Sequence, residues 1–196
     1  TMVFLPSISS AVAVALLWAW LYNPHFGLIN YAIEKTGTAL GIGLTGPQWL
    51  SDPNWAKPAL MIMGFWTLVG GMNMLYYLAA LQGIPHELYE AAEIDGASAW
   101  QTFWAVTWPM ISPATFLILT MSIIGGFQGG FLNAYIMTRG GPSGSTTTIE
   151  YYIFNHLYIY QHAGYAAAIA WLLFMAVLAV SIVHWRRSGK WVFYGA

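Results

Sequence analysis

The side chains best able to do chemistry are few and scattered. The chain has seven acidic residues, six basic residues and five histidines, and no cysteine. His156, His162 and His184 lack metal-ligand spacing, and without cysteine there is no thiolate site or disulfide. An intramembrane enzyme, an ion channel or a proton-coupled carrier would need ionisable groups inside its apolar segments, which hold neither Asp nor Glu. We therefore expect no catalytic centre, no metal and no cofactor in this chain.

A second set of side chains could bind a solute. Amide groups beside aromatic rings suit sugars, which present hydroxyls on apolar rings. The candidates recur at helical spacing in two apolar segments: Trp66, Gly70, Asn73 and Tyr77 in one, and Gln128, Phe131 and Tyr135 in the other. We interpret them as the lining of a solute path. The alternative, given about equal weight, is that the amides bond neighbouring helices and the rings mark the membrane interface.

Glycine-rich stretches are less informative. Gly125, Gly126, Gly129 and Gly130 form two overlapping Gly-x-x-x-Gly pairs, which favour close helix contact over a hinge. Residues 140–144 predict a turn and not a phosphate loop, because no Lys-Ser or Lys-Thr follows the glycines. The sequence contains no Walker A motif, so any energy from ATP would have to come from a separate subunit.

Composition defines the environment in which these residues lie. The chain is 58% hydrophobic, 17% aromatic and only 7% charged, too apolar to cover a soluble globule. Hydrophobic stretches predict four membrane-spanning helices, at residues 3–22, 59–81, 114–136 and 163–185. We therefore predict an all-α polytopic membrane protein, with residues 1–196 forming a single transmembrane domain.

The positive-inside rule orients these spans. Arg186, Arg187 and Lys190 follow the last span and place the C-terminus in the cytoplasm. Residues 82–113 then form an inner loop, and residues 23–57 and 137–162 form outer segments. These outer segments are either a platform for a soluble solute-binding protein or ordinary ordered loops. A net charge of −1 gives no reason to expect nucleic acid, and without a signal peptide pattern we expect upstream residues to be missing.

The inner loop predicts a helix, a turn and a second short helix. Pro85 suits a first helical turn, and Glu87 favours the positive end of the helix. Gly96 is placed to end this helix in a left-handed conformation, and Ser98 has capping-box spacing to Gln101. The loop is acidic, and its helix presents a small, partly apolar surface formed by Leu88, Ala91, Ala92 and Ile94. We interpret this surface as a docking site, with a plain connector as the alternative.

The same loop carries an ordered set of motifs: Glu90-Ala91-Ala92, then Asp95-Gly96-Ala97, then Phe103, Val106, Pro109 and Pro113. Together they resemble the EAA loop of permease subunits in binding-protein-dependent ABC importers. Other segments are similar to carbohydrate-uptake permeases related to the first maltose-transport permease: Phe4-Leu5-Pro6, Gly27-Leu28-Ile29-Asn30, Met137-Thr138-Arg139-Gly140-Gly141-Pro142 with Thr146, and Gly164-Tyr165-Ala166-Ala167-Ala168-Ile169-Ala170. The resemblance covers nearly the whole chain.

This resemblance implies a multi-pass subunit of the bacterial inner membrane that forms part of a path for a carbohydrate. Its partners would be a second permease in a heterodimer, two cytoplasmic subunits that bind ATP and Mg²⁺, and an extracytoplasmic solute-binding protein. By resemblance, coupling to the ATPase falls to Glu87, Glu90, Ala91, Ala92, Asp95, Gly96 and Ala97. The family usually has two further spans upstream, which supports the expectation of missing N-terminal spans.

The chain departs from the family pattern at two positions. Leu132 follows Phe131 where an acidic residue is common, and Arg139 replaces a common glycine. Both departures bear on the identity of the solute, for which glycerol phosphate or amino acids are the alternatives to a sugar. A phosphate would favour Arg or Lys in the pathway, and no basic residue lies within a predicted span. The sequence therefore favours a neutral solute.

Overall fold

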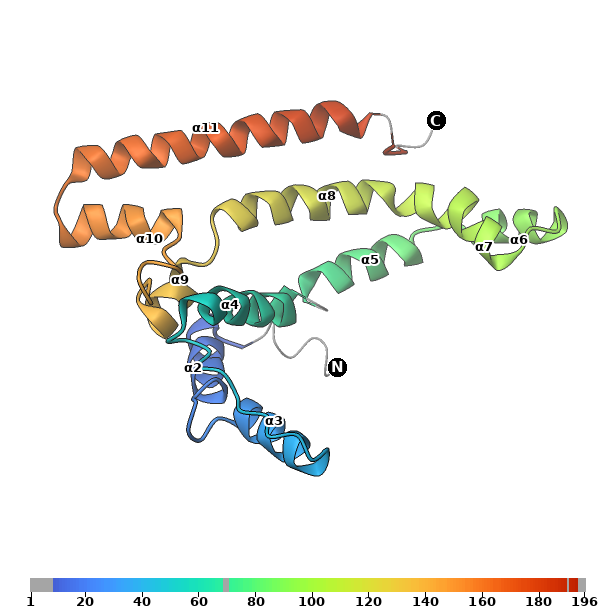
Figure 1. The fold of residues 1–196 in the computed structure, drawn as a ribbon. Helices are drawn as coiled ribbons and strands as arrows, with labels where there is room; N and C mark the ends of the chain where they lie inside the picture. Colours follow the sequence, from blue (N-terminus) through green and yellow to red (C-terminus); the bar gives the residue numbers. More distant parts are fainter. Residues whose placement is uncertain (1–8, 69–70, 190, 194–196) are drawn as a thin grey trace. The chain divides into compact units, whose positions relative to one another are not determined.

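The computed structural model describes residues 9–68, 71–189 and 191–193. Within these ranges the regular structure is helical and contains no strand, which confirms the all-α prediction (Figure 1). The helices in chain order are α2 (Ala11–Leu21), α3 (Leu28–Ala39), α4 (Pro53–Leu68), α5 (Met72–Gln82), α6 (His86–Ile94), α7 (Ala99–Thr102), the π-helix η1 (Phe103–Thr107), α8 (Trp108–Phe127), α9 (Phe131–Asn133), the π-helix η2 (Ala134–Thr138), α10 (Ile149–Phe154), the π-helix η3 (Asn155–Ile159) and α11 (Ala163–Ser188).

Three helical stretches are long and apolar enough to cross a membrane: Pro53–Gln82, Ala99–Thr138 and Ala163–Ser188. The first of them includes residues 69–70, which lie outside the described part of the chain. Helix α2 is apolar but shorter, and the start of the predicted span 3–22 also falls outside the described residues. The most apolar window of α11 is only 6% buried. A helix that exposes apolar side chains all round needs lipid or another chain as its environment.

The helical stretch that contains the third predicted span, 114–136, is longer than that span. The sequence placed its start at residue 114, after two prolines, but the helix runs without interruption from Ala99 through η1 and α8. Pro113 lies inside α8 and cannot donate to the carbonyl of Pro109. The hydroxyl of Ser112 donates to that carbonyl over 2.6 Å instead, which compensates for the missing bond. At the other end, α8 stops at Phe127, and a non-helical break at 128–130 precedes α9.

The second predicted span, 59–81, begins earlier than expected. Residues 23–57 were assigned to an outer segment, but α4 starts at Pro53. The side chain of Asp52 accepts a hydrogen bond from the backbone N–H of Asn54 over 2.8 Å, so Asp52 and Pro53 act as cap and first helical residue. The end of α5 at Gln82 and the start of α11 at Ala163 agree with the sequence within one residue.

The described residues group into two compact units. The first unit comprises Thr1–Val69 and Gln128–Leu173. Its core lies around Tyr22, which is 1% exposed and donates a hydrogen bond to the carbonyl of Ala59 over 2.9 Å. The rings of Trp18 and Trp49 pack on Tyr22 at 5.2 and 5.3 Å. This core therefore joins α2 to α4 and to the segment that precedes α4.

The second unit comprises Gly70–Phe127 and Phe174–Ala196. Helices α5 and α8 lie side by side in it, and α6 and α7 follow α5 (Figure 1). Phe116 on α8 stacks on His184 of α11 at 4.8 Å, and both rings approach Trp191. The backbone N–H of Phe193 donates to Ser112 over 2.8 Å. These contacts pack the C-terminal residues against α8.

Candidate functional site

The predicted helix–turn–helix lies within the second unit, in α6 and α7. Pro85 precedes α6 as its N-terminal cap residue, one position earlier than expected, and Glu87 lies in the first turn. A carboxylate in that turn interacts favourably with the positive end of the helix dipole. His86 and Glu90 lie one turn apart on the exposed surface and form a side-chain hydrogen bond, with His86 Nδ1 3.1 Å from Glu90 Oε1. The helix is short, so these terminal interactions matter for its stability.

The end of α6 is built by Gly96, as the sequence predicted. Asp95 caps the helix, and Gly96 adopts a left-handed conformation with φ of +72°. The backbone N–H of Ala97 donates to the carbonyl of Ala92 over 2.9 Å, and that of Gly96 to Glu93 over 3.0 Å. This pair of bonds is the Schellman arrangement, which satisfies the last carbonyls and reverses the chain direction. The predicted glycine stop is confirmed.

The predicted capping box at Ser98 is also confirmed. The backbone N–H of Gln101 donates to Ser98 Oγ, and the backbone N–H of Ser98 donates to the side-chain oxygen of Gln101 over 2.8 Å. The helix that starts here is not short, however, because α7 continues through η1 into α8. The turn between Gly96 and Ser98 therefore joins α6 directly to a long apolar helix.

A side-chain contact fixes α6 against that helix. The Tyr89 hydroxyl lies 3.1 Å from Thr107 Oγ1, so a hydrogen bond links the middle of α6 to the end of η1. Ile84, just before α6, is buried. The backbone turn and this hydrogen bond give α6 two attachments to the helix that begins at Ala99. A force applied to α6 would be transmitted to both ends of the α7–η1 segment.

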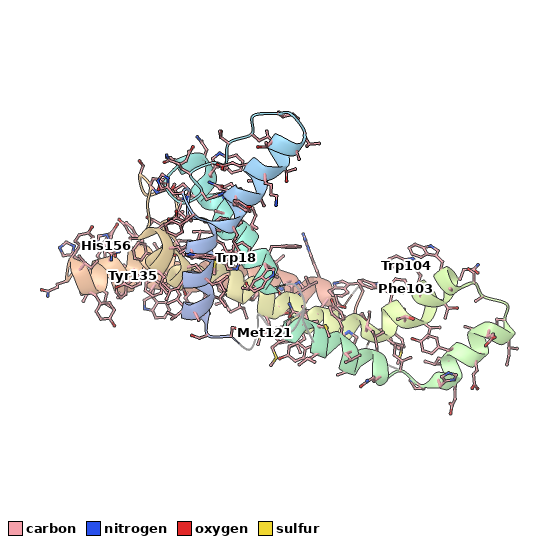
Figure 2. The ribbon with its side chains drawn as sticks, turned by 90° about the horizontal axis from the view of Figure 1, so that it is seen from below. Trp18, Phe103, Trp104, Met121, Tyr135 and His156 are labelled. Carbon is pink, nitrogen blue, oxygen red and sulfur yellow. The ribbon has the colours of Figure 1, made fainter. Side chains whose placement is uncertain are left out.

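The outer surface of this helix–turn–helix is exposed and mixed in character. Ile94 is 86% exposed and Trp100 is 70% exposed. Trp100, Phe103 and Trp104 pack on one another at the start of the helix, with ring centroids 5.2 to 6.1 Å apart; Figure 2 labels Phe103 and Trp104. Of the residues predicted to couple to the ATPase, Ala92 and Ala97 are half-buried. The others are exposed: Glu87, Glu90, Ala91, Asp95 and Gly96. An exposed isoleucine among carboxylates suits a protein partner better than water.

Among the predicted solute-lining residues, the structure brings Phe131 and Tyr135 together. Their rings stack at 5.7 Å in the first unit, and Tyr151 and Phe154 complete an aromatic cluster at 5.0 to 6.5 Å (Figure 2 labels Tyr135). Tyr135 is exposed at 45% and Phe131 is half-buried. The partners of Phe131 come from α10, which the sequence analysis left in an outer loop. The aromatic residues that follow Thr148 in the sequence are the signal that could have identified these partners of Phe131.

The other predicted lining residues are divided between the two units. Trp66 belongs to the first unit and packs edge-on against Trp18 at 5.6 Å, whereas Asn73 and Tyr77 lie on α5 in the second unit, both half-buried. Gly70 lies outside the described residues. Gln128 lies in the break between α8 and α9, so the prediction that it shares one helical face with Phe131 and Tyr135 is wrong. The glycines on both sides of Gln128 explain the break, because glycine is a poor helix former.

Asn30 organises the first outer segment, and sequence reasoning did not identify this role. Its side-chain oxygen accepts from Trp49 Nε1 over 2.7 Å, and its amide donates to the carbonyls of Pro24 and Pro47 over 3.3 and 3.2 Å. Asn30 is 3% exposed. One buried amide thus ties three distant parts of residues 24–49 together. Asn30 ends the Gly27-Leu28-Ile29-Asn30 motif quoted above.

The Gly-Gly-Pro motif is held by two threonines. Thr138 and Thr146 hydroxyls lie 2.6 Å apart, and Thr146 also donates to the carbonyl of Gly141 over 2.8 Å. Arg139 and Gly140 take left-handed conformations with φ of 51° and 80°. A side chain at Gly140 would meet the Tyr151 ring, so the turn also positions the aromatic cluster. Thr146 and this motif therefore form one local unit.

Comparison with known proteins identifies the family. Residues 1–187 match the family described as "Binding-protein-dependent transport system inner membrane component". The chain belongs to this family, which confirms the resemblance inferred from the sequence. Its apolar helices agree with a family of membrane components. Within the described residues, no group of three or more His, Cys, Asp or Glu side chains could hold a metal ion.

Individual relatives include permease proteins of transport systems. The chain is 37% identical over 193 residues to the lactose transport system permease LacF of Rhizobium radiobacter, covering 96% of this chain and 62% of LacF. It is 30% identical over 197 residues to the sn-glycerol-3-phosphate transport system permease UgpA of Agrobacterium fabrum, covering 100% of this chain and 64% of UgpA. A solved bacterial alginate ABC transporter in complex with an alginate pentasaccharide-bound periplasmic protein matches with a TM-score of 0.80 and 26% identity, over 93% of this chain and 61% of that one. The chain therefore spans less than two thirds of each of these proteins.

Proposed function

We propose that this chain is a permease subunit of an ABC importer that forms part of the path for a carbohydrate. Family membership supports the importer class, and LacF and the alginate transporter support a sugar. The proposed partners are a second permease, two cytoplasmic ATPase subunits that bind ATP and Mg²⁺, and a periplasmic solute-binding protein. The permease itself catalyses no reaction. Four spans with a cytoplasmic C-terminus would place 83–98 on the inner side of the membrane.

The single observation that carries this proposal is the exposed helix–turn–helix of α6 and α7. Its carboxylates and Ile94 face outward, while Tyr89 and the Gly96 turn attach it to a helix that can cross a membrane. An ATPase that grips α6 would pull directly on the start of α8. Because packed helices move as rigid bodies, such a pull can switch the permease between two arrangements. We assign ATPase coupling to this surface, formed by Glu87, Glu90, Ala91, Ala92, Asp95, Gly96 and Ala97.

We propose that the solute passes beside the Phe131 and Tyr135 rings. Their exposed aromatic surface suits the apolar face of a sugar, and the other candidate lining residues would contribute two amides and two further rings: Trp66, Asn73, Tyr77 and Gln128. The competing proposal is a phosphorylated solute, because the chain is also similar to the sn-glycerol-3-phosphate permease UgpA. No basic residue lies on the helices that carry these side chains apart from Lys57, near the start of α4, so a neutral sugar is favoured.

The experiment is solute uptake in proteoliposomes that contain the complete transporter and its binding protein. Glu90→Lys should abolish ATP-driven uptake and the retention of ATPase subunits on the permease, because it reverses a charge on the docking surface. Glu34→Lys, the same reversal at an exposed position on α3, is the matched control and should retain the ATPase subunits. If Glu90→Lys retains its ATPase and transports at the wild-type rate, the coupling assignment is wrong.

The solute class is tested in the same vesicles. Uptake of labelled disaccharides and of sn-glycerol-3-phosphate is measured with the binding protein encoded beside this permease. The proposal expects the sugar to be transported and the phosphate ester to be excluded. Transport of glycerol phosphate alone would replace the carbohydrate by its competitor, and the ABC importer assignment would remain.

A further inference from the structure

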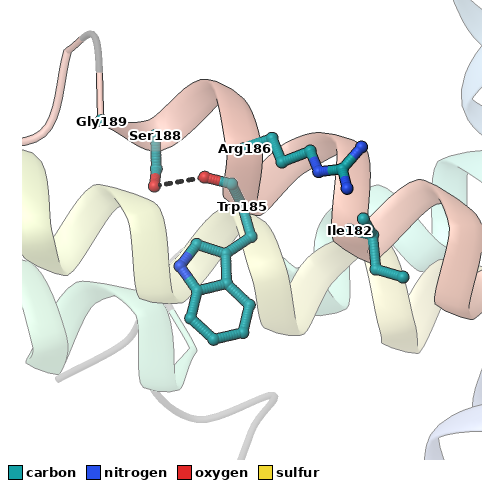
Figure 3. Close-up of a pocket in the computed structure, with 5 residues that line it drawn as sticks. All are labelled: Ile182, Trp185, Arg186, Ser188 and Gly189. Atoms are coloured by element: carbon teal, nitrogen blue, oxygen red, sulfur yellow. Dashed lines mark hydrogen bonds between the residues drawn. The ribbon is translucent and has the colours of Figure 1, made fainter.

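The last turns of α11 line an open pocket of about 540 Å³, within the second unit. Its lining residues are Ile182, Trp185, Arg186, Ser188 and Gly189 (Figure 3). Ser188 is buried and donates its hydroxyl to the carbonyl of Trp185 over 2.7 Å, which satisfies one of the last helical carbonyls. The chain then turns, because Trp191 and Val192 both donate to the carbonyl of Ser188. The pocket is thus part of a defined helix terminus.

The pocket combines an apolar wall with a positive charge. Trp185 is 73% exposed, and with Ile182 it continues the apolar surface of α11. Arg186 lies at the edge of the pocket, and the described residues give neither it nor Arg187 a carboxylate partner. A helix C-terminus carries roughly half a negative charge, which two arginines outweigh. The site therefore offers an unpaired cation directly beside exposed indole and aliphatic surface.

We propose that this pocket binds an anionic phospholipid, with Arg186 paired to the headgroup phosphate and Trp185 and Ile182 against the upper acyl chains. Helix α11 is the most apolar of the candidate spans, and only 6% of its most apolar window is buried within the chain. A basic residue at the end of a span lies at the depth of the phosphates, and tryptophan favours the same interface. A free phosphate ion would leave the apolar wall in water, whereas a phospholipid covers both parts. This inference does not depend on which solute is carried.

The test is native mass spectrometry of the purified transporter titrated with phosphatidylglycerol or phosphatidylcholine. Wild type should prefer phosphatidylglycerol, and Arg186→Gln should weaken that binding by about five-fold, the effect of one charge near an anionic surface. Arg187→Gln is the matched control, because it removes the same charge from a residue that does not line the pocket. Arg187→Gln should lose clearly less phosphatidylglycerol binding than Arg186→Gln. Binding of phosphatidylcholine should not change in either variant.

Three outcomes would overturn the proposal. Equal losses in the two arginine variants would mean diffuse attraction to the surface and no pocket. Displacement of phosphatidylglycerol by inorganic phosphate would mean a free anion as the ligand, and no preference in wild type would mean no site.

Should Arg186→Gln fail to assemble, Trp185→Ala carries the test: it should weaken binding of long-chain phosphatidylglycerol and spare the dihexanoyl form. Equal binding of the long-chain lipid by wild type and Trp185→Ala would also count against the proposal.

Discussion

The hydroxyl of Ser112 accepts a hydrogen bond from the backbone N–H of Phe193 over 2.8 Å, although the two residues lie 81 positions apart. The same hydroxyl donates to the carbonyl of Pro109 over 2.6 Å. Ser112 is completely buried. One small side chain therefore repairs the helix at Pro113 and holds the C-terminal segment 191–193 against α8.

Ser112→Ala should destabilise the protein by about 1–3 kcal/mol, because it leaves the N–H of Phe193 and the carbonyl of Pro109 without their partner. Thermal unfolding of the detergent-purified protein measures the loss, and limited proteolysis should cut after α11 more readily. Ser122→Ala, at an exposed position on the same helix, is the control and should unfold like wild type. Equal stability of the two variants would show that the Ser112 bonds contribute nothing.

Gly96→Ala should weaken the turn between α6 and α7. The added methyl group meets no neighbouring atom, so the cost is that of a left-handed backbone, about 1–2 kcal/mol. We expect faster amide exchange across α6 and reduced coupling of ATP hydrolysis to uptake. Gly164→Ala, in the first turn of α11, has the same open surroundings but ordinary helical geometry, and it should be neutral or slightly stabilising. Similar effects at both positions would contradict this account.

The hydrogen bond between Tyr89 and Thr107 should matter more for transport than for folding. Tyr89→Phe and Thr107→Val each remove it, and a double-mutant cycle on unfolding should give a coupling energy of about 0.5–1.5 kcal/mol. Uptake per ATP hydrolysed should fall in each single variant, because α6 then has one attachment fewer to the α7–η1 helix. Tyr76→Phe, at an exposed tyrosine on α5, is the control. Full transport efficiency in Tyr89→Phe would refute a mechanical role for this bond.

Glu150 should make stability depend on pH. Burial raises the pKa of its carboxyl above the ordinary 4.5, and a hydrogen bond from the backbone of Phe131 opposes this shift only partly. A carboxyl group whose pKa is higher in the folded than in the unfolded state stabilises the fold while it is protonated. Stability should therefore fall as the pH rises from about 4.5 through the raised value. Unfolding midpoints of Glu150→Gln should lack this fall, whereas Glu34→Gln should keep it.

Part of the candidate site was predictable because its signals are local. Gly96 and Ser98 end one helix and begin the next through bonds that span only three to five residues, and both assignments hold. The helix starts near the prolines differ from the prediction for a physical reason. Pro109 and Pro113 are typical of a loop, but both lie inside α8, where Ser112 supplies the donor that Pro113 lacks. Pro53 follows a capping aspartate and begins a helix.

The sequence alone determined the class of protein, since apolar runs without charges require helices in a membrane and the motifs around Glu90 and Gly96 identify the family. It also determined the caps of α6 and α7. Only the tertiary structure decided that Asn30 joins three parts of an outer segment, that Phe131 packs against residues from α10, and that Ser112 binds Phe193. These contacts join residues far apart in the chain, and their partners are selected by packing, for which no local pattern exists.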